Sequence, residues 1–104
     1  MAYEITEQDK ALLNLVAKHE AKSYDTIYGG REVPLRQMLI AEVLDYQRNV
    51  MGRFTACGRY QMLRAVIEEN CRKLNMDPTQ VRLTEDVQDI MMIDKITRMR
   101  KYGK

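Results

Sequence analysis

The strongest candidate for chemistry in this chain is a single glutamate, Glu20, at the end of an expected helix. Leu12, Leu13 and Val16 precede it at intervals of eight, seven and four residues. On a 3.6-residue period it therefore shares their apolar face. A carboxylate on the core side of a helix is either neutralised by a cation such as Arg59, or it stands at the rim of a cleft where loss of water favours its protonated form. The second arrangement is the one that a general acid needs.

A second stretch, residues 56–61 (ACGRYQ), combines a glycine turn with an aromatic and an amide side chain. We expect it to open a helix, which would place backbone N–H groups and the amide of Gln61 at the wall of a cleft. Such groups bind neutral sugars and acetamido substituents well. Cys57 would lie at the same helix N-terminus, where the pKa of a thiol can fall. The sequence offers that thiol no nearby histidine, which disfavours a nucleophilic cysteine.

The metal-ligating residues of the chain are few. His19 is the single histidine, and neither it nor the two cysteines, Cys57 and Cys71, stand at the spacing of zinc ligands. We therefore expect neither a metal nor a cofactor.

Hydrophobic periodicity predicts about four helices, over residues 7–20, 39–51, 59–74 and 84–101. Between the first two, residues 26–28 are typical of a short strand, and Gly29 and Gly30 favour a tight turn. Pro34 forces the residue before it into an extended conformation. The sequence thus predicts a small β-hairpin between Tyr24 and Leu35. The expected fold class is α+β, mainly α, in a single domain over residues 1–104.

The candidate residues stand in a recognisable order along the chain. Glu20 is followed by residues 24–30 (YDTIYGG), 58–61 (GRYQ), 73–78 (KLNMDP) and 87–89 (VQD). This combination resembles the phage lysozyme-like peptidoglycan-cleaving family, which includes lambda-type endolysins and virion-associated muramidases or lytic transglycosylases. The resemblance spans roughly residues 10–95, and its specificity lies in the ordered set rather than in any one motif. It implies a lysozyme-like fold that lacks the C-terminal helices of longer relatives.

The resemblance also implies an activity, which is cleavage of the β-1,4 bond between N-acetylmuramic acid and N-acetylglucosamine. By it, Glu20 is the catalytic acid, and Gly58 with Gln61 forms part of the glycan cleft. The other residues expected to contact sugar or shape the cleft are Tyr24, Asp25, Tyr28, Arg59 and Tyr60. Of these, Tyr24 and Tyr60 are equally well interpreted as core aromatics.

Two chemical routes remain open at this point. Hydrolysis by two carboxylates needs a second Asp or Glu about 5–9.5 Å away, and Asp25 is the nearest candidate in sequence. In lytic transglycosylases the muramic 6-hydroxyl attacks in place of water, and one glutamate acts as acid and then as base. No clear second carboxylate motif is present, so we slightly prefer the transglycosylase route.

The last expected helix is apolar around most of its circumference and needs covering on more than one side. The three preceding helices could cover residues 85–101, but a further segment, a second copy of the chain or another virion protein would do so more easily. Two hypotheses follow from this. The chain is an enzyme whose cleft an assembly completes, or it is a weakly active or inactive lysozyme-like component of a phage tail or baseplate.

Composition limits the partners and the location. The net charge of +2 does not by itself favour nucleic acid. The chain has no signal-peptide pattern and no apolar run of about 18 residues, so we expect no membrane partner. The expected partner is a peptidoglycan glycan strand. The expected location is the phage tail, or the host cytoplasm before release to the cell wall.

Overall fold

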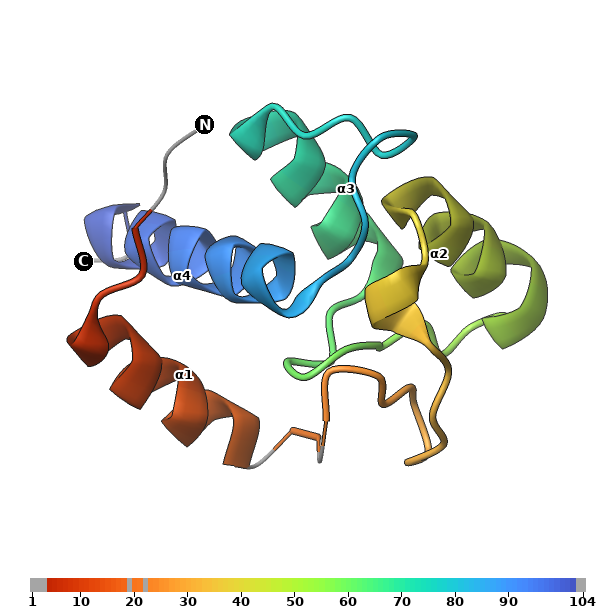
Figure 1. The fold of residues 1–104 in the computed structure, drawn as a ribbon, viewed down its shortest axis with the longest axis horizontal. Helices are drawn as coiled ribbons and strands as arrows, with labels where there is room; N and C mark the ends of the chain where they lie inside the picture. The colour runs from red at the N-terminus through yellow and green to blue at the C-terminus, as the bar shows by residue number, and fades with distance from the viewer. Residues whose placement is uncertain (1–3, 19, 22, 103–104) are drawn as a thin grey trace.

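The computed structural model describes residues 4–18, 20–21 and 23–102, and within them it contains four α-helices. These are α1 (Glu7–Lys18), α2 (Ile40–Tyr46), α3 (Arg64–Leu74) and α4 (Glu85–Tyr102). A 3₁₀ turn (Leu35–Gln37) precedes α2, and a π-helical stretch (Gln47–Met51) extends it. Helix α4 contacts α1 on one side and α3 on the other, and α2 packs against α3 (Figure 1).

The helix ends follow from local sequence. Thr6 and Asp9 cap the start of α1 reciprocally, since the Asp9 backbone N–H donates to Thr6 Oγ1 and the Thr6 N–H donates to Asp9 Oδ2, both at 3.0 Å. Thr84 caps α4 through a bond from the Val87 N–H at 3.3 Å. Asn75 ends α3 in the left-handed conformation, with φ of 56°. These ends agree with the sequence-based expectations.

The expected α+β fold with a small hairpin is wrong, because the described residues contain no β-strand and no sheet. Thr26 and Glu32 form only an isolated bridge. The chain does turn at Gly29 and Gly30, but the backbone N–H of Tyr28 donates to Ala56 O at 2.8 Å and not to the returning segment. Bonds from the Ile27 N–H to Arg31 O and from the Val33 N–H to Asp25 O, at 2.7 and 2.9 Å, close the turn within the loop, and the second loop adds the bond through Ala56. These bonds do not extend into strands, and the described part of the chain is a small helical domain.

The third helix begins later than residue 59. Cys57 and Met62 exchange both backbone hydrogen bonds, at 3.0 and 2.8 Å, which closes residues 57–62 into a tight loop. Gln61 has a φ of 49° within this loop, and no right-handed helix contains such a residue. Helix α3 therefore starts at Arg64, and the GRYQ motif stands in a loop and not at a helix N-terminus.

The core lies where α4 meets the other helices. Met91, Met92 and Ile93 of α4 are all buried, because α1 and α3 flank that helix. Much of the apolar circumference of α4 is thus covered within the chain, although Met99 is 62% exposed. A partner bound through residues 85–101 stays a prediction. No helix in the described part of the chain is both long enough and apolar enough to cross a bilayer.

Candidate functional site

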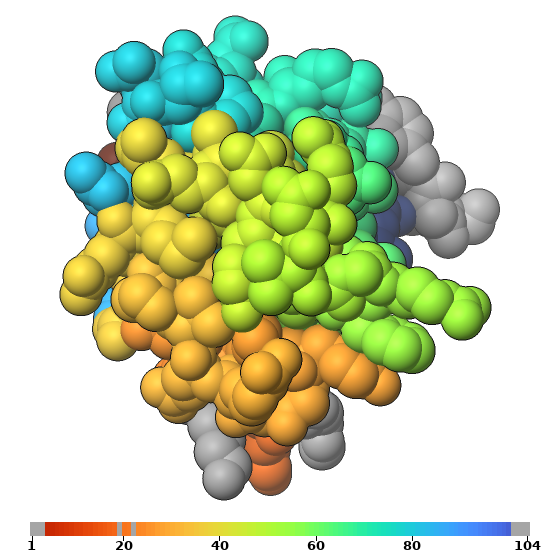
Figure 2. Space-filling view, turned by 90° about the vertical axis from the view of Figure 1, so that its right-hand side faces the viewer, coloured from red at the N-terminus to blue at the C-terminus, as the bar shows by residue number. Residues whose placement is uncertain are grey.

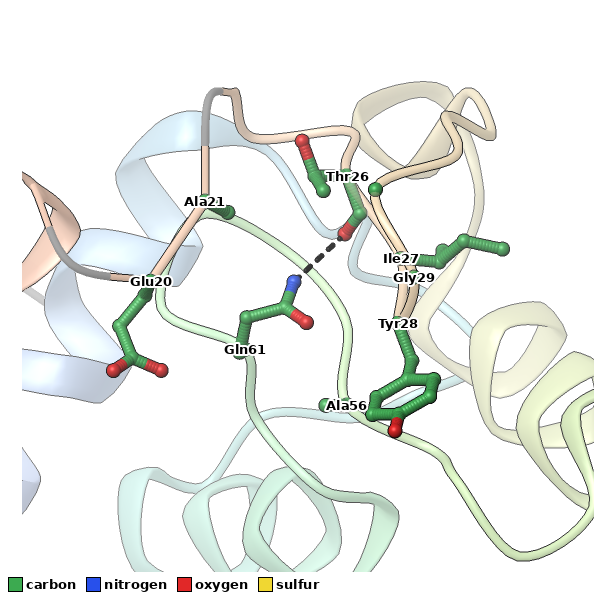
Figure 3. A pocket seen from close by; sticks show the side chains of 9 residues that line it. Glu20, Ala21, Thr26, Ile27, Tyr28, Gly29, Ala56 and Gln61 are labelled. Carbon is green, nitrogen blue, oxygen red and sulfur yellow. Dashed lines mark hydrogen bonds between the residues drawn. The ribbon is translucent and has the colours of Figure 1, made fainter.

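A pocket of about 560 Å³ opens between the end of α1 and the two loops that contact each other. Its volume lies in the range of small-molecule sites. Figure 3 shows Gln61 between Glu20 and Tyr28, so three separated segments converge there. The residues that line the pocket are Glu20, Ala21, Thr26, Ile27, Tyr28, Gly29, Gly30, Ala56 and Gln61.

Glu20 stands in the turn that follows α1. Its backbone N–H donates to Ala17 O at 3.0 Å, and its side chain is exposed. Leu13 and Ala17, by contrast, are buried. The expectation that Glu20 shares their core face is wrong, because α1 ends at Lys18 and the helical period does not extend to position 20.

The alternative of an ion pair between Glu20 and Arg59 is also not observed. The Arg59 guanidinium donates to Tyr24 Oη at 3.1 Å, to Tyr60 Oη at 3.2 Å and to Asn14 Oδ1 at 2.7 Å. Among the described residues, no cation lies within ion-pair distance of Glu20. Glu20 is exposed and lines the pocket, so its side chain is accessible to a ligand there.

Gln61 links the two loops at the back of the pocket. Its side-chain Nε2 donates to Thr26 O at 3.2 Å and to Gly58 O at 2.9 Å. The side-chain oxygen is turned away from Thr26 (Figure 3), where it can accept a hydrogen bond from a ligand. A left-handed backbone is unfavourable for glutamine, and such strain persists where the surrounding structure over-determines it.

Gln88 of α4, which is not among the candidate residues expected from the sequence, binds both loops from the core side. Its side chain is fully buried. Its Oε1 accepts from the Arg59 N–H at 2.9 Å, and its Nε2 donates to Tyr24 O at 3.1 Å and Leu83 O at 3.0 Å. The available signal was a glutamine inside the apolar run of residues 87–93, since a polar residue on a buried helix face requires partners.

Three of the residues expected to contact sugar, Tyr24, Arg59 and Tyr60, lie in a separate cluster around Asp89. The Asp89 carboxylate accepts from Tyr24 Oη at 2.9 Å and from Tyr60 Oη at 2.5 Å. Burial, and next the bond to Asp89, raises the pKa of both phenols. Tyr24 and Arg59 line a second, smaller hollow of about 220 Å³ together with Asp89.

Asp25 is held away from the main pocket. Arg36 binds its carboxylate through Nε to Oδ1 and through a terminal nitrogen to Oδ2, both at 3.2 Å, and through its backbone N–H at 3.1 Å. Arg36 also pairs with Glu85 at 2.6 Å. Within the described residues, Glu20 is thus the one carboxylate that lines the pocket.

Gly58 has a different role from the one expected. Its φ is +84°, and a Cβ built there would lie 2.5 Å from Gln88 Oε1. Glycine is required because the loop passes directly over the buried amide of Gln88. It positions the neighbouring residues and does not itself line the main pocket.

The cysteines are packing residues. Cys57 is buried, and burial raises its thiol pKa to about 12. Burial likewise raises the pKa of Cys71 to about 11. The lowering of the thiol pKa that a helix N-terminus could cause does not occur at position 57, because the thiol is desolvated and the helix begins seven residues later. The described residues contain no group of three His, Cys, Asp or Glu side chains placed to hold a metal ion.

Comparison with models of protein families, with curated proteins and with solved structures found no match to this chain.

Proposed function

We propose that this chain cleaves the β-1,4 bond between N-acetylmuramic acid and N-acetylglucosamine in peptidoglycan, with Glu20 as its single catalytic acid. One observation supports this above the others. Glu20, Tyr28 and Gln61, each assigned to the glycan cleft by the resemblance in sequence, line one pocket although up to 41 residues separate them. The pocket combines a carboxylate, an aromatic ring and an amide, which suits a neutral acetamido sugar.

In the proposed mechanism the protonated Glu20 donates to the glycosidic oxygen as the bond to the anomeric carbon breaks. The exposed position of Glu20 in the free chain requires the glycan itself to exclude water from the carboxyl group. A sugar that fills the pocket would do so. The amide of Gln61 would orient the substrate by accepting a hydrogen bond from an acetamido N–H.

The position of Asp25 favours the transglycosylase route over two-carboxylate hydrolysis. Its carboxylate is bound by Arg36 and does not line the pocket. The Glu20 carboxylate formed in the first step would take the proton from the muramic 6-hydroxyl while that oxygen attacks the anomeric carbon. The product is a 1,6-anhydro end, and the carboxyl group returns to its starting state.

A second candidate is a glycan-binding structural component of a phage tail or baseplate with little or no activity. The exposure of Glu20 favours it, since a general acid is ordinarily desolvated. A phage tail, or the cytoplasm of a host before lysis, is the setting proposed for either function.

Digestion of isolated sacculi, followed by mass spectrometry of the released muropeptides, tests both candidates. The comparison uses the wild-type chain, Glu20→Gln and the control Glu32→Gln. Glu32 is an exposed carboxylate of the same loop that does not line the pocket. We expect 1,6-anhydro products from the wild type and the control, and their loss in Glu20→Gln. Reducing-end products would identify hydrolysis, and no release by the wild type, alone or with its virion partners, would reject the enzyme.

A further inference from the structure

Two aromatic side chains stack on each other at the edge of the pocket. The rings of Tyr28 and Phe54 have centroids 4.8 Å apart and planes inclined by 13°. Tyr28 is 51% exposed and Phe54 is 56% exposed. Each ring covers one face of the other, and the rest of each side chain is largely exposed. We refer to this pair as the aromatic ledge.

The backbone beneath the aromatic ledge is well fixed. The Tyr28 N–H donates to Ala56 O at 2.8 Å, and the Gly58 N–H donates to Thr26 O at 2.7 Å. Ile27, next to Tyr28, is buried in the core. The loop that follows α1 and the segment after α2 adjoin on one face of the molecule, in orange and in lime to green in Figure 2. Both rings are thus exposed on a surface that the core supports.

We propose that the aromatic ledge is a second sugar-binding subsite, which takes one pyranose ring of a β-1,4-linked glycan whose adjoining units occupy the pocket. This rests on the proposed function. Tyr28 belongs to both features, since it lines the pocket and stacks on Phe54. The C–H bonds on one face of a β-pyranose carry small positive partial charges, which the negative face of an aromatic ring attracts.

The size of the ledge argues for a sugar and against a protein. Two side chains offer far less area than the roughly 800 Å² that each partner buries in a stable protein interface. Their immediate chain neighbours, Gly29 and Arg53, are exposed and add no apolar side chain to the patch. A single sugar ring matches the area that is available.

The test is calorimetric titration with N-acetylglucosamine oligomers from the disaccharide to the hexasaccharide. All variants carry Glu20→Gln, so that no oligomer is cleaved. Phe54→Ala removes the outer ring, Phe54→Leu keeps an apolar side chain without an aromatic face, and Phe54→Tyr keeps the face. Val50→Ala is the matched control, because Val50 is 63% exposed and lies outside the ledge. Circular dichroism verifies that each variant is folded. If Phe54→Ala unfolds, the comparison of Phe54→Leu with Phe54→Tyr still tests the aromatic ledge.

We expect Phe54→Ala to weaken hexasaccharide binding by roughly threefold to tenfold, the size typical of one aromatic contact. Phe54→Leu should lose nearly as much, and Phe54→Tyr and Val50→Ala should lose nothing. Disaccharide binding should be equal in all variants. Three outcomes would overturn the proposal for the aromatic ledge. They are equal hexasaccharide affinity in Phe54→Ala and Val50→Ala, full affinity in Phe54→Leu, and no measurable binding of the hexasaccharide. If Glu20→Gln still digests sacculi while hexasaccharide binding still depends on Phe54, the catalytic role of Glu20 is rejected and the aromatic ledge is retained.

Discussion

Gly58 lies directly against the buried amide of Gln88, so closely that a Cβ at position 58 would stand 2.5 Å from Gln88 Oε1. This contact lets one glutamine of α4 bind the amide of Arg59 and the carbonyl of Tyr24 together. Those two groups belong to the two loops that flank the pocket. The shape of the pocket therefore depends on a residue that does not line it.

Gly58→Ala should lower the free energy of unfolding by about 2–4 kcal/mol, since it adds a left-handed alanine and a steric conflict with a buried side chain. Gly29→Ala is the matched control. Gly29 also has a positive φ, but nothing lies within 4 Å of its added Cβ. Urea unfolding of both variants separates backbone strain from the conflict with Gln88. Equal losses in the two variants would contradict the role given to the contact.

Gln88→Glu should be strongly destabilising at neutral pH. A carboxylate can accept from the Arg59 N–H, but it would face the carbonyl oxygens of Tyr24 and Leu83 without a proton to donate. We expect a loss of about 2–4 kcal/mol in urea unfolding at pH 7. Protonation supplies the missing donor, so the loss should shrink as pH falls towards 4. The exposed Gln80→Glu serves as the control and should show neither effect.

The sequence predicted the helices where side-chain periodicity reflects burial on one continuous face. It failed at residues 59–63, because a glutamine in the left-handed conformation gives no signal in a hydrophobic pattern. It failed at the hairpin because the pairing across the turn stops at the bonds between Ile27 and Arg31 and between Val33 and Asp25, while the Tyr28 N–H donates to Ala56 O in the second loop. Both failures concern loops whose conformation is fixed by tertiary contacts.

The residues predicted for the candidate site likewise separate into those that line the pocket and those that lie elsewhere. Glu20, Tyr28 and Gln61, which come from three of the ordered motifs, line one pocket. Arg59 and Tyr60 precede Gln61 directly, yet Tyr60 donates to Asp89 on α4 and the Arg59 guanidinium donates to the Tyr60 hydroxyl. Neighbouring loop residues can point to different sides, and a motif alone carries no information on which side each takes.

Asp25→Asn should leave the cleavage of sacculi nearly unchanged and still give 1,6-anhydro products. The physical reason is that Asp25 is bound to Arg36 and does not line the pocket. The variant should lose a little stability, about 1 kcal/mol or less, because the ion pair is partly exposed. Muropeptide analysis beside Glu20→Gln is the measurement. A loss as large as that of Glu20→Gln would show that two carboxylates act together.

Stability should fall at alkaline pH because two thiols are buried. The pKa of Cys57 is raised from 9.0 to about 12 in the folded chain, so the folded state keeps a proton that the unfolded state releases above pH 9. The stabilisation is fully present below pH 9 and is lost as pH rises through 12. Cys71, with its pKa raised to about 11, acts in the same direction.

The free energy of unfolding should fall by about 1.4 kcal/mol per pH unit for each thiol that has ionised only in the unfolded state. Urea unfolding between pH 8 and pH 11 measures it. Cys57→Ala should be less stable at every pH because it leaves a cavity, but its stability should fall less steeply above pH 9. A wild-type profile that is flat from pH 9 to pH 11 would contradict the burial of both thiols.

Gln61 combines a strained backbone with an amide in the pocket, and two substitutions separate these features. Gln61→Gly accepts a φ of 49° without strain, whereas Gln61→Ala keeps the strain, and both remove the amide. We expect the alanine variant to be less stable than the glycine variant by about 1 kcal/mol.

Both variants of Gln61 should bind N-acetylglucosamine oligomers about tenfold more weakly, since each loses one hydrogen bond to the sugar and the link to Thr26. Because this bond is made to the bound substrate and the transition state alike, KM for sacculus cleavage should rise with little change in kcat. Wild-type KM in Gln61→Gly would show that the amide serves only to connect the two loops.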